Sequence, residues 1–527
     1  MRHSQMPLKP KKLMLLAIDA SPEDRMQQWM DAGDLPNLAR LRAKGAQGAI
    51  ESTADYMAGT PWPSFFTGTY PSEHGWMFYL VWRPDLMKFL RASPEWQPVE
   101  PFYRNFPQDG PRVIAVDVPI TYGPKPFNGV ELTGWGTHDK IGAPGAYPLG
   151  LIERIKREIG PMPIPDEFAG AQSARALLKL RDELIAAADW HSRACRLLMK
   201  ENAWDLLLLA FGSVHRIGHK AWNRYGATGE LSEQEGKALD DAMRQVAIAT
   251  DKALGEIIDA AGEEVNVIAF SLHGMTENYS VYPMISRMLD RITRDEKRDD
   301  PETVAKSPFA RLRESLPLEL RSRIKAKLPF AVQDAMTMFW RTDARDWSKT
   351  KAFALAGDLE GLIHVNLKGR ERDGIVEPGA EYDALLGKIR AGFESFVDIE
   401  TGEPLVRDIT RGSEIWPEGV QRRVLPDLVM RTTVRSARQI RGFRSEQYGT
   451  VYNHDYGGYV DGRPGHHIGD GWFVAAGPDI PGRGALPKIH EFDLLATVHT
   501  LVGQQMRPEM RGTPVPGLVP NDPAVED

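Results

Sequence analysis

Five residues that could bind a metal lie beside short apolar runs of the sequence. Asp19 ends the run "LMLLAI", His273 follows "VNVIAFS", and His467 shortly precedes "GWFVAAGPDI". His215 and His219 lie four residues apart, just past "WDLLLLAFG". Imidazole nitrogens and carboxylate oxygens are ligands that suit zinc, iron and manganese. A single histidine after a strand is usually a hydrogen-bonded structural residue, but the five together favour a metal site.

The apolar runs are typical of strands that are buried on both faces of a sheet, because each is short and continuous. Helical patterns alternate with them, among others over 173–201, 231–262 and 490–503. This alternation predicts an α/β fold with a mostly parallel sheet covered on both faces. In such a sheet, ligands bind beyond the carboxyl ends of the strands. The sequence therefore brings Asp19 and several histidines to one edge.

Composition limits the class of protein. The chain has 527 residues, is 42% hydrophobic and can bury a large core. Its net charge of −7 gives no general attraction to nucleic acid or anionic membranes. Cys195 is the one cysteine, which excludes an internal disulfide and fits a reducing compartment. "LMLLAI" is too short for a signal peptide or a membrane span. We expect a soluble, cytoplasmic enzyme whose partners include neither nucleic acid polymers nor membranes; a homo-oligomer remains open.

The pattern changes between about residues 276 and 425. The stretch 287–328 is highly charged and has helical spacing. We interpret this region as a helical insertion, placed over the sheet as a cap, within one catalytic domain that spans residues 1–527.

The segments resemble, in order and over nearly the whole chain, the type I phosphodiesterase/nucleotide pyrophosphatase branch of the alkaline phosphatase superfamily. The most specific stretch, "PWPSFFTGTYPSEHG", is similar to the family's W-x-x-F-x-T-G-x-x-P-x-x-H-G segment. "HRIGH" lies where the family has D-x-x-G-H, and "SLHGM" where it has S-D-H-G-M. "HIGDGWFVAAGPDI" is similar to the strand that brings the last metal-binding histidine. The resemblance implies a three-layer α/β/α fold and a two-metal site that splits phosphate or sulfate esters.

The resemblance assigns the first metal to His215, His219 and His467, with His215 in place of the family's aspartate. Three imidazoles and an open position are a known catalytic arrangement for zinc. Loss of the carboxylate makes the ion more electropositive, which favours metal-bound hydroxide at neutral pH. We expect one tightly held divalent ion, zinc first, with manganese or iron as alternatives.

The second metal of the family would depend on Asp19 and His273. Leu272 occupies the position of a further aspartate ligand and cannot bind a metal. The second site is therefore predicted to be weak, shifted or absent. Alternatively, Asp19 and His273 turn toward the single ion, as ligands or behind its ligands.

The nucleophile of the family is also displaced. Counting back from Thr67–Gly68 gives Ala58, and an alanine cannot attack. Thr60 is the nearest hydroxyl in "MAGTPW". It either reaches the pocket as the nucleophile or caps the helix that starts with Pro61. If Thr60 only caps the helix, hydroxide on the metal must attack instead.

These features predict a metal-dependent hydrolase of phosphoric mono- or diesters that acts on a small molecule, with attack by Thr60 or by metal-bound hydroxide. Sulfate and phosphonate esters are alternative substrates. A repurposed or non-hydrolytic descendant, which binds a metal or ligand on the same fold, is the other class of function. Ala58 and Leu272 favour that second class, whereas the set of possible metal ligands favours the hydrolase.

Overall fold

A computed structural model describes residues 12–95, 99–137, 141–163, 170–301, 345–357 and 359–520. At its centre is a ten-stranded sheet. In spatial order its strands are β22 (Gly484–Ala485), β2 (Ala46–Glu51), β21 (Asp470–Ala476), β11 (Val265–Ser271), β1 (Lys12–Ile18), β9 (Leu206–Phe211), β5 (Val113–Val116), β6 (Gly129–Thr133) and β7 (Gly145–Tyr147), with β23 (Ile489–His490) beside β2.

The middle of the sheet is parallel, as the sequence predicts. β1 pairs in parallel with both β11 and β9, and β5 pairs in parallel with β9 and β6. β21 and β7 run antiparallel to their neighbours. All residues of β9 and β11 are buried, and so are all residues of β1 after Lys12. Burial on both faces explains why these strands are continuous apolar runs without alternation.

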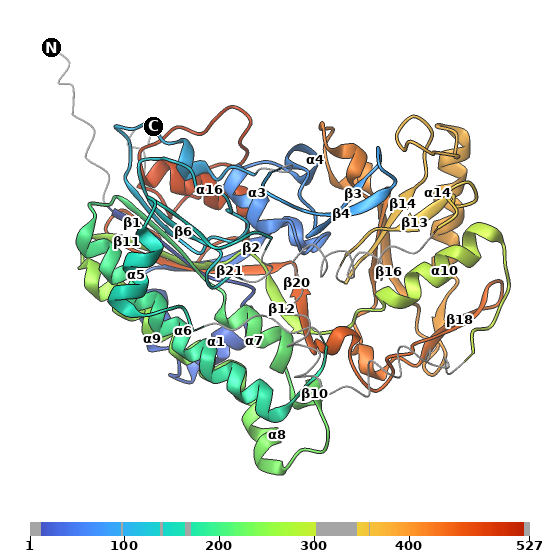
Figure 1. Ribbon diagram of the computed structural model, residues 1–527, viewed down its shortest axis with the longest axis horizontal. Coiled ribbons are helices and arrows are strands. Elements are labelled where there is room, and N and C mark those ends of the chain that lie inside the picture. Colours follow the sequence, from blue (N-terminus) through green and yellow to red (C-terminus); the bar gives the residue numbers. More distant parts are fainter. Residues whose placement is uncertain are drawn as a thin grey trace.

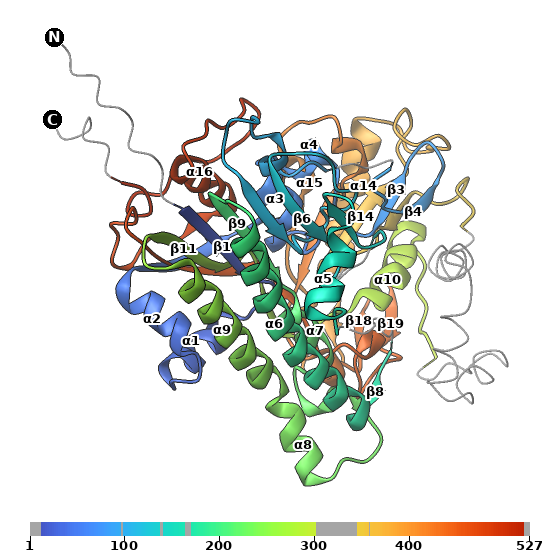
Figure 2. The same cartoon turned by 60° about the vertical axis from the view of Figure 1, so that its left-hand side comes forward.

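Helices cover both faces of the sheet (Figures 1 and 2). Two apolar clusters lie on opposite faces of β1, since its successive side chains alternate between them. The three-layer α/β/α prediction is confirmed. One layer contains α1 (Glu23–Asp31), α2 (Pro36–Lys44), α6 (Ala174–Glu201), α7 (Ser213–Ala221) and α9 (Ala242–Ala261), and the other contains α3 (Pro61–Thr67) and α16 (Glu491–Leu501).

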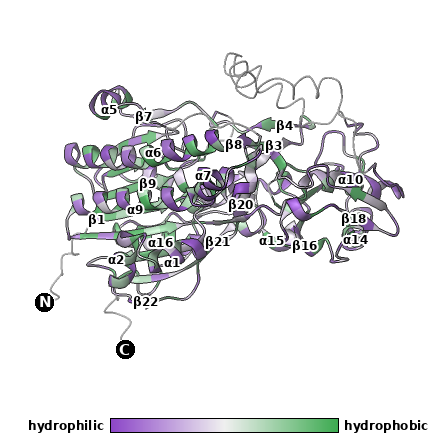
Figure 3. Ribbon diagram, turned by 90° about the horizontal axis from the view of Figure 1, so that it is seen from below, coloured by the Kyte–Doolittle hydropathy of each residue, from purple (hydrophilic) through white to green (hydrophobic). Residues whose placement is uncertain are grey.

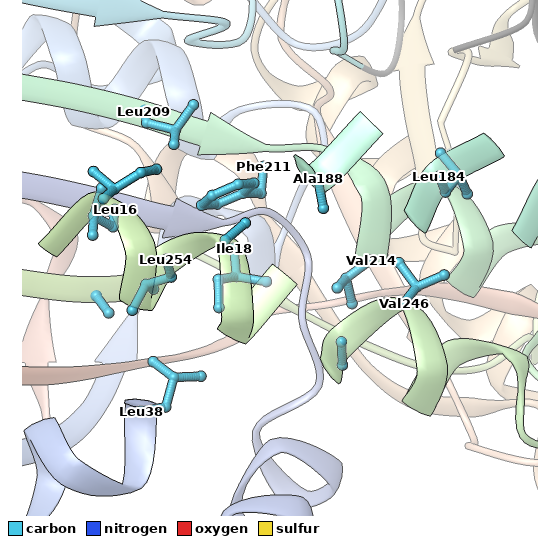
Figure 4. Packing of buried hydrophobic residues seen from close by; sticks show 14 of the residues in the cluster. Leu16, Ile18, Leu38, Leu184, Ala188, Leu209, Phe211, Val214, Val246 and Leu254 are labelled. Atoms are coloured by element: carbon cyan, nitrogen blue, oxygen red, sulfur yellow. The ribbon is translucent and has the colours of Figure 1, made fainter. Parts of the chain in front are cut away.

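The packing of the first layer fixes the start of α7 (Figure 4). Leu16 of β1 and Phe211 of β9 belong to the same buried cluster as Val214 of α7 and Leu254 of α9. Figure 3 shows that α6 and α9 carry both hydrophilic and hydrophobic residues, as expected of helices with one face on a sheet. Phe211, before the short turn from β9 into α7, and Val214, after it, therefore both pack in this cluster and hold the turn in place.

A second module lies beside the main sheet (Figure 1). Its core extends from Val281 to Val451 and is mixed α/β rather than purely helical. Residues 302–344, which hold much of the charged stretch, lie outside the described residues. The strands of this module are two to six residues long. Such short runs give a weaker sequence pattern than the highly charged stretch that precedes them. The module contains α10 (Tyr282–Arg294), α14 (Ala380–Glu394), the sheet of β13 (Ala352–Ala354), β14 (Gly361–Val365), β17 (Leu428–Thr432) and β16 (Val406–Arg411), and the sheet of β15 (Val397–Asp398), β18 (Gly442–Ser445) and β19 (Gly449–Tyr452).

Shorter elements complete the described chain. Among the described helices, none is both long and apolar enough to span a membrane. Besides short 3-10 helices, the remaining elements are α4 (Pro71–His74), α5 (Leu151–Ile159), α8 (Glu233–Asp240), α15 (Gly412–Ile415), the pair β3 (Leu80–Arg83) and β4 (Lys88–Arg91), the pair β8 (Gln172–Ser173) and β10 (Ala227–Thr228), and the pair β12 (Gly274–Glu277) and β20 (Gly465–Ile468).

Candidate metal centre

Three histidines from two distant parts of the sequence meet beyond the carboxyl ends of the central strands. His215 and His219 lie on α7, which begins two residues after β9 ends. Their spacing of four places both rings on one face of the helix. His467 lies on β20, opposite Met275 of β12, and β12 follows β11 after a short turn. The ends of β9 and β11, which flank β1 in the sheet, thus position the three rings.

The three rings converge through their Nε2 atoms. His467 Nε2 lies 2.7 Å from His215 Nε2, which lies 3.1 Å from His219 Nε2. One nitrogen from each ring falls within a group whose atoms are all within 4.8 Å of one another. All three side chains are buried. The structure therefore brings together the three residues that the sequence assigns to the first metal.

The contacts of Nδ1 in His215 and His219 indicate which nitrogen of each ring carries the proton. His219 Nδ1 lies 2.9 Å from the carbonyl oxygen of Gly465, which can only accept, so Nδ1 carries the proton. His215 Nδ1 lies 2.6 Å from Asp19 Oδ2 and likewise donates. In the neutral rings both Nε2 atoms then carry lone pairs that face each other. A cation between them satisfies both lone pairs, so this donor set fits a divalent metal.

Asp19 lies behind His215 rather than in the donor set. Its Oδ2 accepts the His215 Nδ1–H, and its Oδ1 accepts the indole N–H of Trp62 at 2.8 Å. Burial alone would raise the pKa of Asp19, but the His215 and His273 rings and both hydrogen bonds hold this pKa well below its usual range. An ionised carboxylate behind a ligand imidazole fixes the ring and increases its basicity. Of the two arrangements left open above, this geometry matches Asp19 behind the ligands.

His273 lies beside the cluster without joining its donor set. Its ring centroid is 5.0 Å from that of His467 and 6.1 Å from that of His215. Its neighbour Leu272 is buried in the apolar cluster under α3. His466 accepts the backbone N–H of His467 through Nδ1 and is not a member of the donor set either.

Close backbone contact lets α7 approach β20. A Cβ atom on Gly465 would lie 2.2 Å from the carbonyl oxygen of Gly218. A Cβ atom on Gly218 would lie 2.3 Å from the sulfur of Met275. A side chain at Gly465 would therefore push β20 away from the backbone of α7, whereas one at Gly218 would displace the flexible Met275 side chain. No sequence pattern indicated a role for these glycines, although each lies within a few residues of a predicted ligand.

Thr60 precedes α3, as predicted, but its hydroxyl does not cap that helix. The side chain is fully buried, and its hydroxyl lies 2.7 Å from both the Met57 carbonyl oxygen and Thr53 Oγ1. The capping alternative was wrong because the backbone of Thr60 is already close to helical (φ −96°, ψ −22°). A capping side chain needs an extended backbone to reach forward to the first amides.

The Thr60 hydroxyl belongs to a buried polar chain. Thr53 donates to Ser64 Oγ at 3.1 Å, and His74 Nε2 lies 3.1 Å from the same oxygen. The Trp76 amide donates to His74 Nδ1, so Nε2 is the protonated nitrogen and donates to Ser64. Burial lowers the pKa of His74 to about 3, which keeps its ring neutral. The chain of hydroxyls holds the turn from residue 53 to α3 in place.

Comparisons with known proteins find one matching family model and solved structures of low identity. No curated protein matches the sequence. Among solved structures, murine ectonucleotide pyrophosphatase/phosphodiesterase 5, as an inactive form with AMP, is 13% identical, with 95% of this chain and 97% of that chain covered and a TM-score of 0.45. Phosphonoacetate hydrolase from Sinorhizobium meliloti with phosphonoformate is also 13% identical, with coverage of 94% and 96% and a TM-score of 0.48.

The family model is the informative match. The model described as type I phosphodiesterase/nucleotide pyrophosphatase matches residues 13–426, which include the candidate ligands Asp19, His215, His219 and His273. His467 lies beyond the matched part, although its ring completes the cluster. With this match over most of the chain, the protein belongs to the type I phosphodiesterase/nucleotide pyrophosphatase family.

Proposed function

We propose that the protein is a metal-dependent hydrolase of phosphoric esters, with one divalent ion held by His215, His219 and His467. The convergence of three Nε2 atoms, two of them in rings whose Nδ1 already donates, is the observation that carries this proposal. When bound, such an ion lowers the pKa of a coordinated water and polarises a phosphoryl oxygen. Zinc is the metal we expect first, because three imidazoles and an open position suit it.

The residues around the ion have separate tasks in this proposal. Asp19 orients His215, and the Gly465 carbonyl orients His219, so that both present Nε2 inward. We assign to His273, whose ring lies beside that of His467, a hydrogen bond to an oxygen of the substrate rather than a second metal site, because Leu272 offers no ligand atom. The burial of the three ligands limits bulk water and strengthens each electrostatic contact.

The attacking group in this proposal is water rather than Thr60. Two observations support the choice. The Thr60 side chain is fully buried, and its hydroxyl is engaged by Met57 and Thr53. Ala58, at the position expected of the nucleophile, has no hydroxyl.

The choice is tested by Thr60→Ala. We expect kcat/KM for phosphate esters to fall less than about tenfold, because the hydroxyl does not attack. The free energy of unfolding should fall by about 1–3 kcal/mol, because the hydrogen bonds to buried partners are lost. The measurements are steady-state hydrolysis and mass spectrometry of quenched enzyme. A phosphorylated residue 60 in the wild type, together with an inactive but folded variant, would show that Thr60 attacks.

The number of metal ions provides an independent test. We expect close to one tightly bound zinc ion per wild-type chain, because Leu272 offers no ligand atom beside His273. Leu272→Asp should raise the zinc content toward two, whereas Leu272→Asn, which is similar in size but uncharged, should not. Elemental analysis after dialysis measures both. Two tightly held ions in the wild type would contradict the single-ion site.

The hydrolase itself is tested on a panel of chromogenic phosphate monoesters, phosphodiesters, phosphonates and sulfates, with zinc, manganese and iron supplied separately. We expect turnover of phosphoric esters that depends on the added metal. Ala58 and Leu272 favour the alternative function, a repurposed protein of the same fold that binds a metal or ligand without hydrolysis. Stoichiometric metal without turnover of any ester would decide for that alternative.

A further inference from the structure

Trp62 joins α3 to the metal centre through a single carboxylate. Its indole N–H donates to Asp19 Oδ1 at 2.8 Å, while Asp19 Oδ2 accepts the His215 Nδ1–H at 2.6 Å. Both side chains that flank the carboxylate are buried, and Asp19 itself is only 4% exposed. Each oxygen of Asp19 is therefore held by one N–H group, which fixes the plane of the carboxylate as well as its position.

The indole is itself held in place by apolar packing. Its ring packs edge-on against Phe65 of α3, with centroids 6.2 Å apart, and lies 6.2 Å from the ring of Phe270 on β11. Leu272 belongs to the same cluster. These contacts prevent the indole from turning away, and the surrounding low dielectric strengthens its hydrogen bond to the carboxylate.

We propose that Trp62 is a positioning residue for the metal centre: it holds Asp19 against His215, and thereby directs His215 Nε2 toward His219 and His467. The inference rests on the metal site of the proposed function. Because Trp62 lies on α3, this helix helps to hold the ligand His215 in place through Asp19. The indole N–H also occupies Asp19 Oδ1, the oxygen that is not already paired with His215.

The test is a double-mutant cycle on zinc affinity, measured by competition with a chromogenic chelator at fixed pH and salt. Asp19→Ala should weaken zinc binding about 10–100-fold, as expected when the partner of a ligand imidazole is removed. Trp62→Phe should weaken it about three- to tenfold, in keeping with the net contribution of one intramolecular hydrogen bond. In the Asp19→Ala background, Trp62→Phe should have no further effect, because the indole acts only through the carboxylate.

Two further variants separate the hydrogen bond from packing. Phe65→Leu removes an aromatic ring from the same cluster without touching Asp19, and should change zinc affinity less than about twofold. If Trp62→Phe does not fold, Trp62→2-naphthylalanine keeps a bicyclic ring and removes only the N–H group. It should reproduce the loss of affinity.

The outcomes separate this inference from the proposed function. Zinc binding that Trp62→Phe leaves unchanged, or weakens equally in both backgrounds, overturns the role of Trp62 alone. Tight zinc with the expected coupling, but no ester hydrolysis, overturns the proposed activity alone. A wild-type protein that binds no zinc overturns both.

Discussion

His219→Ala is expected to leave a folded protein that retains little zinc and hydrolyses phosphate esters on the order of a thousandfold more slowly. The variant loses one of three converging ligand nitrogens. The remaining pair, His215 and His467, gives an incomplete coordination shell for zinc. The Gly465 carbonyl also loses its partner, which should lower the free energy of unfolding by only about 1 kcal/mol. Zinc content, circular dichroism and kcat/KM measure the three effects.

Controls for this prediction use histidines outside the donor set. His454→Ala removes an exposed histidine and should leave zinc content and kcat/KM unchanged. His466→Ala removes the neighbour of His467, which lies outside the donor set, and should cost far less zinc than His467→Ala. A fully loaded and active His219→Ala protein would refute the three-histidine site.

The cluster of histidines could be predicted because its geometry is mostly local. His215 and His219 share a helix face whatever the rest of the fold does, and the buried run before them makes that helix follow a strand. Asp19 and His273 follow strands that pair directly with each other in the sheet. Proximity therefore follows from the parallel sheet, which the alternation of strands and helices already predicts.

Side-chain direction could not be predicted in the same way. Asp19 contacts Trp62 and His215, which lie 43 and 196 residues away in sequence, so its hydrogen bonds depend on the complete tertiary packing. The Thr60 hydroxyl turns back to Met57 and Thr53 because of its own backbone angles, which a residue pattern does not specify. The mixed α/β nature of the second module was missed for a related reason, since its short strands are stabilised by cross-strand pairing.

A second large effect is expected from Glu491, the first residue of α16. Its side chain is fully buried, and Oε1 accepts the backbone N–H of Thr53 at 3.0 Å. Among the described residues, none provides a hydrogen bond to Oε2. Burial raises the pKa of Glu491 to about 8, although the hydrogen bonds from Thr53 partly offset this shift. The carboxyl group is therefore neutral at pH 7, next to the turn that precedes α3.

The sign of the resulting pH dependence follows from proton binding. Between about pH 5 and pH 8 the folded protein keeps the Glu491 proton that the unfolded chain has lost, so rising pH favours unfolding. The free energy of unfolding should fall by about 1.4 kcal/mol per pH unit in this window and level off above about pH 8. Burial lowers the pKa values of His74 and His499 to about 3 and about 4. These two residues lower the free energy of unfolding only below about pH 6.5, where they bind a proton in the unfolded chain but not in the folded protein. Glu491 therefore dominates among these groups above pH 7.

Glu491→Gln isolates this contribution. The amide oxygen can still accept the Thr53 N–H, and the side chain carries no titrating proton, so its free energy of unfolding should stay level where that of the wild type falls. Urea unfolding at pH 6, 7, 8 and 9, with equal zinc saturation, gives both curves, and their difference should widen by about 3 kcal/mol from pH 6 to pH 9. Glu263→Gln, at an exposed position, should follow the wild-type curve. Parallel curves for wild type and Glu491→Gln would mean that Glu491 is already ionised at pH 6. The turn that holds Thr53 and Thr60 would then rest on a buried negative charge, which the neutral Ser64–His74 chain does not balance.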